Sequence, residues 1–158
     1  MQELKGQEVS RAPDPKVNVQ VSAFLPDDYV PDEDLKMEFY RRLADARTFE
    51  DVAKIEEELS DRFGRLPAPA VALLDVMRVK IGARKLGLVA VSIGAKLRMT
   101  FAEGRELERA DVERMVRGSH LPLQFTLVPE TVVDAELPGR TEAERLGHVR
   151  KAVEGMCA

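Results

Sequence analysis

The pattern of apolar and polar residues changes from a strand period to a helical period within the first third of the chain. Across VNVQVSAFL, residues 17–25, apolar residues fall mostly on alternate positions, which predicts a half-buried strand. After a proline-bracketed turn, Leu35, Phe39 and Leu43 recur at four-residue spacing. This spacing predicts an amphipathic helix that directly follows the strand.

Two further helices are predicted before the next strand. Their repeating apolar positions are Val52, Ile55, Leu59 and Phe63, and then Ala70, Leu73, Leu74, Met77 and Ile81. Thr48, followed three residues later by Asp51, is a weaker form of the capping box that begins a helix, and Gly64 suits the end of that helix. Pro67 and Pro69 fit the first turn of the third helix, which is expected to end at Gly87.

Short strands dominate the next part of the chain. LVAVSI at 88–93 and LRMTF at 97–101 are separated by a short turn that contains Gly94 and Ala95, which predicts a β-hairpin. PLQFTLV at 122–128 and TVVDAEL at 131–137 are candidates for two more strands. Their order in a sheet is left open by the sequence.

Two helices are predicted within this C-terminal half. A short one covers about 111–117 and is expected to end at Gly118, and the last one begins at a capping box of Thr141 and Glu144. The apolar stripe of the last helix consists of Leu146, Val149, Val153 and Met156. The order of strand, three helices, several strands and helix predicts a single α+β domain with a mostly antiparallel sheet.

Length and composition agree with one ordinary domain. The chain has 158 residues, of which 44% are hydrophobic and 33% charged, as expected of a globular protein with one core. Residues 6–16 contain glycine, two prolines and alternating charges, which is typical of a linker, so the domain is expected to cover 16–158. No apolar run approaches the roughly 18 residues of a membrane span, and no signal peptide is recognisable, so we expect a cytoplasmic protein without membrane contact.

Sequence patterns of catalytic and metal sites are scarce. No phosphate loop of the form GxxxxGK[ST], no GxGxxG after a strand and no GxSxG elbow occurs. His120 and His148 have no second histidine or cysteine at ligand spacing, and the single Cys157 excludes an internal disulfide. We therefore expect no enzymatic activity, metal or cofactor in this chain.

Charge is distributed unevenly, although the net charge is only −4. Residues 32–62 carry eleven acidic and six basic side chains, whereas residues 65–105 carry eight basic and two acidic ones. Such asymmetry favours oriented docking onto a charged partner. Ordinary solvated helix faces are the alternative, since helices usually carry their charges toward water.

The second helix concentrates the acidic side chains. Helical geometry places Glu50, Lys54, Glu57 and Asp61 away from the core and Asp51, Glu58 and Arg62 along one flank. The helix dipole disfavours Glu58 and Asp61, which lie near the C-terminal end, so stability alone does not account for them. A docking surface is one interpretation, and an ordinary ion pair between Glu58 and Arg62 beside a solvated Asp61 is the other.

The basic segment that follows permits an alternative function. Its basic residues are Arg78, Lys80, Arg84, Lys85, Lys96 and Arg98. They could contact nucleic-acid phosphates, but no aromatic residues for base stacking are interleaved with them. A solvated helix face with one hairpin edge is therefore favoured, and a nucleic-acid-binding accessory domain is kept as the alternative.

Several of these segments resemble a known family in order and spacing. The runs LPDDYVPDEDLKMEFYRRLADART, EELSDRFGRLP and ALLDVMRVKIGARKLGL are similar to the C-terminal domain of the bacterial transcription-repair coupling factor family. The resemblance covers residues 17–88, and ELSDRFGRLP at 58–67 is its most specific part. Residues 1–15 look like the end of a preceding helix followed by the family's linker. Lys36 departs from the family, which more often has arginine there.

The resemblance implies a regulatory role within a large ATP-dependent DNA translocase that displaces stalled RNA polymerase and recruits excision-repair proteins. ATP and Mg²⁺ would bind only in motor domains outside this chain. The domain would dock on the repair-helicase-like module of the same protein and mask its binding site for the damage-recognition ATPase. Glu58 and Asp61 would accept hydrogen bonds from arginines of that module, and Arg62 would bind a carboxylate or backbone oxygen.

Overall fold

The computed structural model describes residues 14–158, so the linker predicted over 1–15 lies almost entirely outside the described residues. The elements in chain order are β1 (Lys16–Val19), α2 (Glu33–Asp45), α3 (Phe49–Phe63), α4 (Ala68–Leu86), β2 (Leu88–Ile93), β3 (Lys96–Phe101), α5 (Arg109–Ser119), β4 (Gln124–Thr126), β5 (Val132–Glu136) and α6 (Glu142–Cys157). This order confirms the predicted α+β domain.

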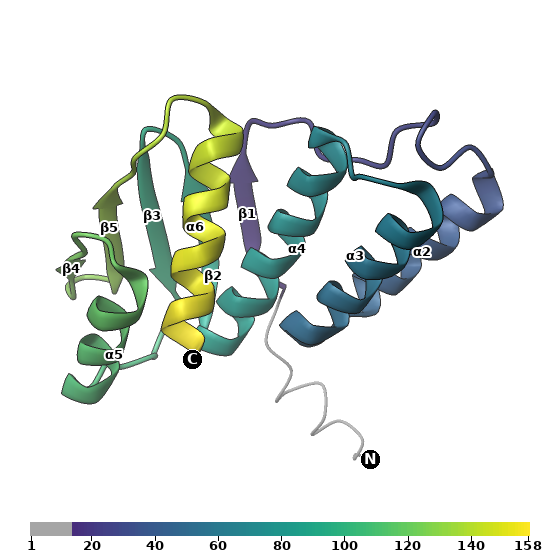
Figure 1. Ribbon diagram of the computed structural model, residues 1–158. Coiled ribbons are helices and arrows are strands. Elements are labelled where there is room, and N and C mark those ends of the chain that lie inside the picture. Colours follow the sequence, from purple (N-terminus) through teal and green to yellow (C-terminus); the bar gives the residue numbers. More distant parts are fainter. Residues whose placement is uncertain (1–13) are drawn as a thin grey trace, which may run out of the picture.

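A five-stranded sheet in the order β1-β2-β3-β5-β4 forms one layer of the molecule. Only β1 and β2 are parallel, and the other three pairs are antiparallel. Helices α4 and α6 cross in front of this sheet, while α2 and α3 lie beyond its β1 edge (Figure 1). The predicted mostly antiparallel sheet is therefore confirmed, and the structure supplies the strand order that the sequence left open.

The first strand is shorter than its sequence pattern indicates. It ends at Val19, and the strand predicted as far as residue 25 is wrong beyond that point. The N–H of Phe24 donates to the carbonyl of Pro69, and the N–H of Leu25 donates to the hydroxyl of Tyr40, so the chain there bonds to helices rather than to a strand. Alternate side chains still pack on the core, which explains the period of two.

The three consecutive helices α2, α3 and α4 agree with the prediction. Thr48 caps α3 in a complete capping box with Asp51, and Gly64 follows its last residue with a φ of 87°. Gly87 ends α4 in the left-handed region, which glycine adopts at little cost. Local sequence chemistry therefore sets the boundaries of these helices.

Helix α5 continues past the predicted end at Gly118, which is a correction. The helix includes Ser119, and His120 takes the left-handed position after it. Gly118 instead lies where α5 crosses α6, and a Cβ atom added to it would collide with the backbone of Gly155. This glycine serves close helix packing rather than helix termination.

The interior consists of two hydrophobic clusters that share α4. One cluster joins the sheet to α4, α5 and α6, with Val79 and Ala83 of α4 inside it. The other joins α2 and α3 to the opposite side of α4 through Leu74 and Ile81. Helices α2 and α3 are thus held away from the sheet by a helix that is buried on two faces.

Within residues 14–158, no helix combines the length and apolar character needed to cross a bilayer.

Candidate functional site

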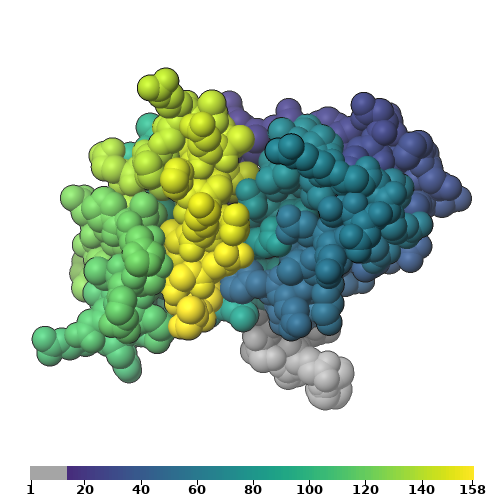
Figure 2. Space-filling model, viewed as in Figure 1, coloured from purple at the N-terminus to yellow at the C-terminus, as the bar shows by residue number. Residues whose placement is uncertain are grey.

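The polar face of α3 points away from both hydrophobic clusters. Its buried residues are Val52, Ile55 and Leu59, which pack toward α2 and α4. Glu50, Lys54, Glu57 and Asp61 are exposed, as the helical periodicity predicts. In the space-filling view, α2 and α3 form the surface on the opposite side of the molecule from α5 (Figure 2). This end of the domain is therefore accessible to a partner.

Glu58 is the centre of an ion-pair cluster between α2 and α3. Its Oε1 lies 2.9 Å from Nη2 of Arg42, and its Oε2 lies 3.2 Å from Nη1 of Arg62. The hydrogen bond from Arg42, opposed by some burial and assisted by Arg62, lowers the pKa of the Glu58 carboxyl. The predicted pair with Arg62 exists, but both carboxylate oxygens of Glu58 are already engaged within the domain.

Arg42 is the residue of this cluster that the sequence analysis did not identify. It belongs to α2, and its guanidinium lies 5.3 Å from the ring centroid of Phe39. The guanidinium of Arg62 similarly lies 5.6 Å from the ring of Phe63, and the two rings pack edge to face at 6.2 Å. Helices α2 and α3 are joined by a short connection and form a helical hairpin. An ion pair between a basic residue of α2 and an acidic residue of α3 could therefore have been expected from the sequence.

Asp61 differs from Glu58 although both were predicted to accept a partner's arginine. Its side chain is exposed in the last turn of α3, and it forms no ion pair within residues 14–158. The structure therefore brings Glu58, Asp61 and Arg62 onto one surface but gives them different roles. Asp61 offers a free acceptor, whereas Glu58 orders two arginines.

A shallow hollow lies beside this cluster in the groove between α2 and α3. Its volume is about 280 Å³, and its lining residues are Arg42, Asp45, Ala46, Asp51, Lys54 and Ile55. Four of the six lining residues are charged, and both signs of charge are present. This composition suits contact with the polar surface of another protein better than retention of an apolar ligand.

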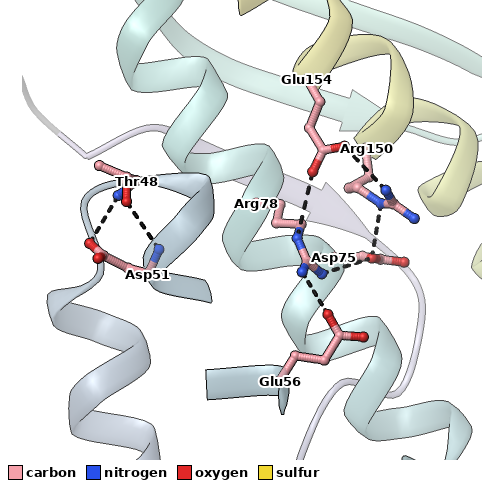
Figure 3. A network of polar contacts seen from close by, with 7 residues as sticks. All are labelled: Thr48, Asp51, Glu56, Asp75, Arg78, Arg150 and Glu154. Atoms are coloured by element: carbon pink, nitrogen blue, oxygen red, sulfur yellow. Dashed lines mark hydrogen bonds and ion pairs between the residues drawn. The ribbon is translucent and has the colours of Figure 1, made fainter. Parts of the chain in front are cut away.

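A second ion network holds α3 against the rest of the domain. Arg78 of α4 contacts Glu56 of α3 at 2.6 Å, Glu154 of α6 at 3.6 Å and Asp75 at 3.9 Å, and Arg150 of α6 contacts Asp75 at 3.3 Å (Figure 3). Asp75 is only 6% exposed, and this burial raises the pKa of its carboxyl against the opposing effect of the two arginines. These contacts connect three helices at the point where the two hydrophobic clusters meet.

The predicted basic region does not form one surface. Arg78 is engaged in the network just described, while Lys96 and Arg98 lie on the sheet face opposite α4. There they pair with Glu136 at 3.6 Å and Asp134 at 2.8 Å. The six basic side chains are thus divided between separate parts of the domain.

Three of these basic residues, Lys80, Arg84 and Lys85, lie in the C-terminal turns of α4. Arg84 bonds to Asp14 at 2.6 Å, and the ammonium of Lys85 lies 5.2 Å from the ring of Phe49. Lys80 forms no ion pair within residues 14–158. Lys36 of α2 is buried and bonded to a neighbouring aspartate, so it does not extend the exposed surface.

The histidines and the cysteine belong to separate environments. His120 ends α5, His148 lies on α6, and Cys157 is half-buried, with burial raising the pKa of its thiol. The thiol lies 3.7 Å from the carbonyl oxygen of Gly82, at hydrogen-bond distance. Within residues 14–158, no three side chains of histidine, cysteine, aspartate or glutamate gather as metal ligands would.

Comparison with known proteins identifies relatives of much greater length. The chain is 44% identical over 73 residues to the transcription-repair-coupling factor of Escherichia coli (strain K12), covering 46% of this chain and 6% of that protein. It is 36% identical over 120 residues to the factor of Mycobacterium tuberculosis (strain CDC 1551 / Oshkosh), covering 73% of this chain and 10% of that protein. The chain therefore spans a tenth or less of these relatives.

Structural comparison agrees with the sequence relationship. The crystal structure of the C-terminal domain of transcription-repair coupling factor superposes with a TM-score of 0.77 at 22% identity, covering 90% of this chain and 91% of that one. The family model described as the TRCF domain matches residues 19–112, which include α2, α3 and α4. The chain belongs to the TRCF domain family.

Proposed function

We propose that this domain is a regulatory docking module of a transcription-repair coupling ATPase. It packs on the repair-helicase-like module of the same protein and covers the site that binds the damage-recognition ATPase. Engagement of RNA polymerase and DNA favours the undocked state and opens that site. ATP and Mg²⁺ act in motor domains outside this chain, and the parent works in the cytoplasm on DNA.

The observation that carries this proposal is the free carboxylate of Asp61 beside the ordered cluster of Arg42, Glu58 and Arg62. This arrangement lies on the exposed end of α3, away from the sheet. Complementary charges fix the orientation and the choice of a docking partner more than they increase raw affinity. A surface with one free acceptor next to ordered donors suits a selective and reversible contact.

A reversible contact is sufficient because both modules belong to one chain. Tethering gives the domain a high effective concentration, on the order of millimolar for short flexible linkers, so that a weak intrinsic affinity still keeps it docked. A modest gain in binding free energy, from contacts with polymerase and DNA that only the undocked state makes, then shifts the population to that state. The docked and undocked states differ only in which surfaces are covered.

The first test is capture of the damage-recognition ATPase by the full-length coupling factor, with and without residues 16–158, at matched salt. Asp61→Arg in the full-length protein is then expected to raise capture toward the level of the deletion. Asp61 is the better position because arginine at the C-terminal end of α3 is favoured by the helix dipole. Glu58→Arg would instead gather three guanidiniums at one place.

The matched control is Glu103→Arg, which makes the same charge change at an exposed position in the turn between β3 and α5. Equal capture by wild type, deletion and Asp61→Arg would contradict the docking function. The nucleic-acid alternative would then be tested by salt-dependent DNA binding of the chain and its loss in Lys80→Ala and Arg84→Ala.

A further inference from the structure

We propose that Arg42 of α2 is a positioning residue of the docking surface and that it sets which partner chemistry this surface accepts. The inference rests on the proposed function and adds to it a residue and a partner requirement. Arg42 binds one oxygen of Glu58, and Glu58 binds Arg62 through its other oxygen. Arg42 therefore helps to set the geometry in which Arg62 meets the partner.

The geometry of the cluster supports a positioning role. Glu58 is 34% exposed and lies between its two arginines, which are 38% and 48% exposed. The Arg42 guanidinium has two contacts, since it binds Glu58 and also lies near the ring of Phe39. A guanidinium that is already ordered loses less conformational entropy on binding than a free side chain, so the cluster is preorganised for its partner.

The charge balance of the cluster specifies the partner. Arg42 and Arg62 bring two positive charges, and Glu58 neutralises one of them, which leaves a net positive cluster beside the free carboxylate of Asp61. With Asp61 included the four charges cancel, so a partner surface that carries only cations would meet the two guanidiniums as well as the two carboxylates. The matching protein surface offers a cation to Asp61 and carboxylate or carbonyl oxygens to the arginines.

A double-mutant cycle in the full-length coupling factor tests this role, with capture of the damage-recognition ATPase as the readout. Arg42→Ala and Glu58→Ala are each expected to raise capture by about two- to fivefold, the range of a partly exposed ion pair. The double variant should raise capture no further than the larger single effect, because Arg42 acts through Glu58. Arg41→Ala is the control, since Arg41 is an exposed arginine of the same helix.

A charge swap separates positioning from a purely structural contribution. Arg42→Glu combined with Glu58→Arg keeps an ion pair between α2 and α3, so the thermal unfolding midpoint should stay close to that of the wild type. The guanidinium at position 58 would then lie beside Arg62 and no carboxylate would hold Arg62 in place. Capture should therefore stay above the wild-type level. Capture restored to the wild-type level would overturn the positioning role.

Two other results are decisive in different ways. Additive effects of Arg42→Ala and Glu58→Ala, or equal capture by Arg42→Ala and Arg41→Ala, would overturn this inference while Asp61→Arg still supports docking. No change in Asp61→Arg or in the deletion of residues 16–158 would refute the proposed function itself. The failure of this inference and the failure of the function are thus distinguishable.

Discussion

Gly118 and Gly155 show how single residues set the distance between two helices. Each lies where α5 meets α6, and a Cβ on either would collide with the backbone of the other. Gly147 of α6 is different, because no atom beyond its chain neighbours and the adjacent backbone of its own helix lies within 4 Å of a Cβ added there. The contribution of a helical glycine therefore depends on what faces it.

Gly118→Ala is expected to lower the free energy of unfolding by about 1–3 kcal/mol, since the added methyl group must separate two packed backbones. Gly147→Ala is the matched control and is expected to raise the free energy of unfolding by up to about 1 kcal/mol, because alanine favours the helix. Urea unfolding of the two variants beside wild type measures both effects. An unchanged free energy of unfolding in Gly118→Ala would show that α5 can shift away from α6 without loss of stability.

Capping boxes define the start of several helices. Asp51 accepts hydrogen bonds from the backbone N–H groups of Arg47 and Thr48. Its own N–H donates to the Thr48 hydroxyl, and Figure 3 shows the two bonds between Thr48 and Asp51. Glu144 plays the same part for α6 with Arg140 and Thr141. The backbone hydrogen bonds lower the pKa of both carboxyls, because they stabilise the charged form.

These lowered pKa values contribute to the acid response of the domain. The pKa of Asp51 is lower in the folded chain than in the unfolded one, so the stability it provides is present above the ordinary carboxyl pKa, about 4, and is lost as the pH falls through the lowered value. Asp51→Asn should therefore be less stable at neutral pH and lose less stability on acidification. Thermal midpoints between about pH 7 and 3 would measure this.

Glu103→Gln is the control for this titration because Glu103 is exposed and caps no helix among residues 14–158. Its acid response should follow that of the wild type. Parallel pH profiles for Asp51→Asn and wild type would contradict a role of the cap carboxylate in acid stability.

The whole domain consists of a sheet-containing part and a helical part that meet at α4. Helices α2 and α3 contact the remainder through one hydrophobic cluster and through the ion network around Arg78. The sheet cluster is larger and involves α4 and α6 together. Surfaces that must dock and release are commonly carried by the less firmly held part of a structure.

Hydrogen exchange should reveal this division. Amides of α2 and α3 are expected to exchange through an opening of lower free energy than those of β2, β3 and α6, because α2 and α3 can separate from α4 while the sheet cluster stays intact. Arg78→Met should lower protection in α3 more than in β3, since it removes the contact with Glu56. Mass spectrometry of the native chain measures both, and uniform protection would indicate one cooperative unit.

Local elements were predictable where local chemistry decides them. The caps at Thr48 and Thr141 and the glycine at the end of α4 fixed those helix boundaries correctly. The strand predicted over 17–25 failed beyond Val19 because a period of two reports which side chains are buried, not which groups the backbone bonds to. The prediction that Gly118 ends α5 was wrong because the role of this glycine depends on α6, a helix distant in sequence.

The sequence by itself determined the α+β class, the helices of the N-terminal half and the exposure of Asp61, since these depend on periodicity and capping within a few residues. Only the tertiary structure decided the strand order, the division of the basic region and the contact of Arg42 with Glu58. Those features depend on how separate elements pack, and side chains distant in sequence become neighbours only after the elements have assembled around α4.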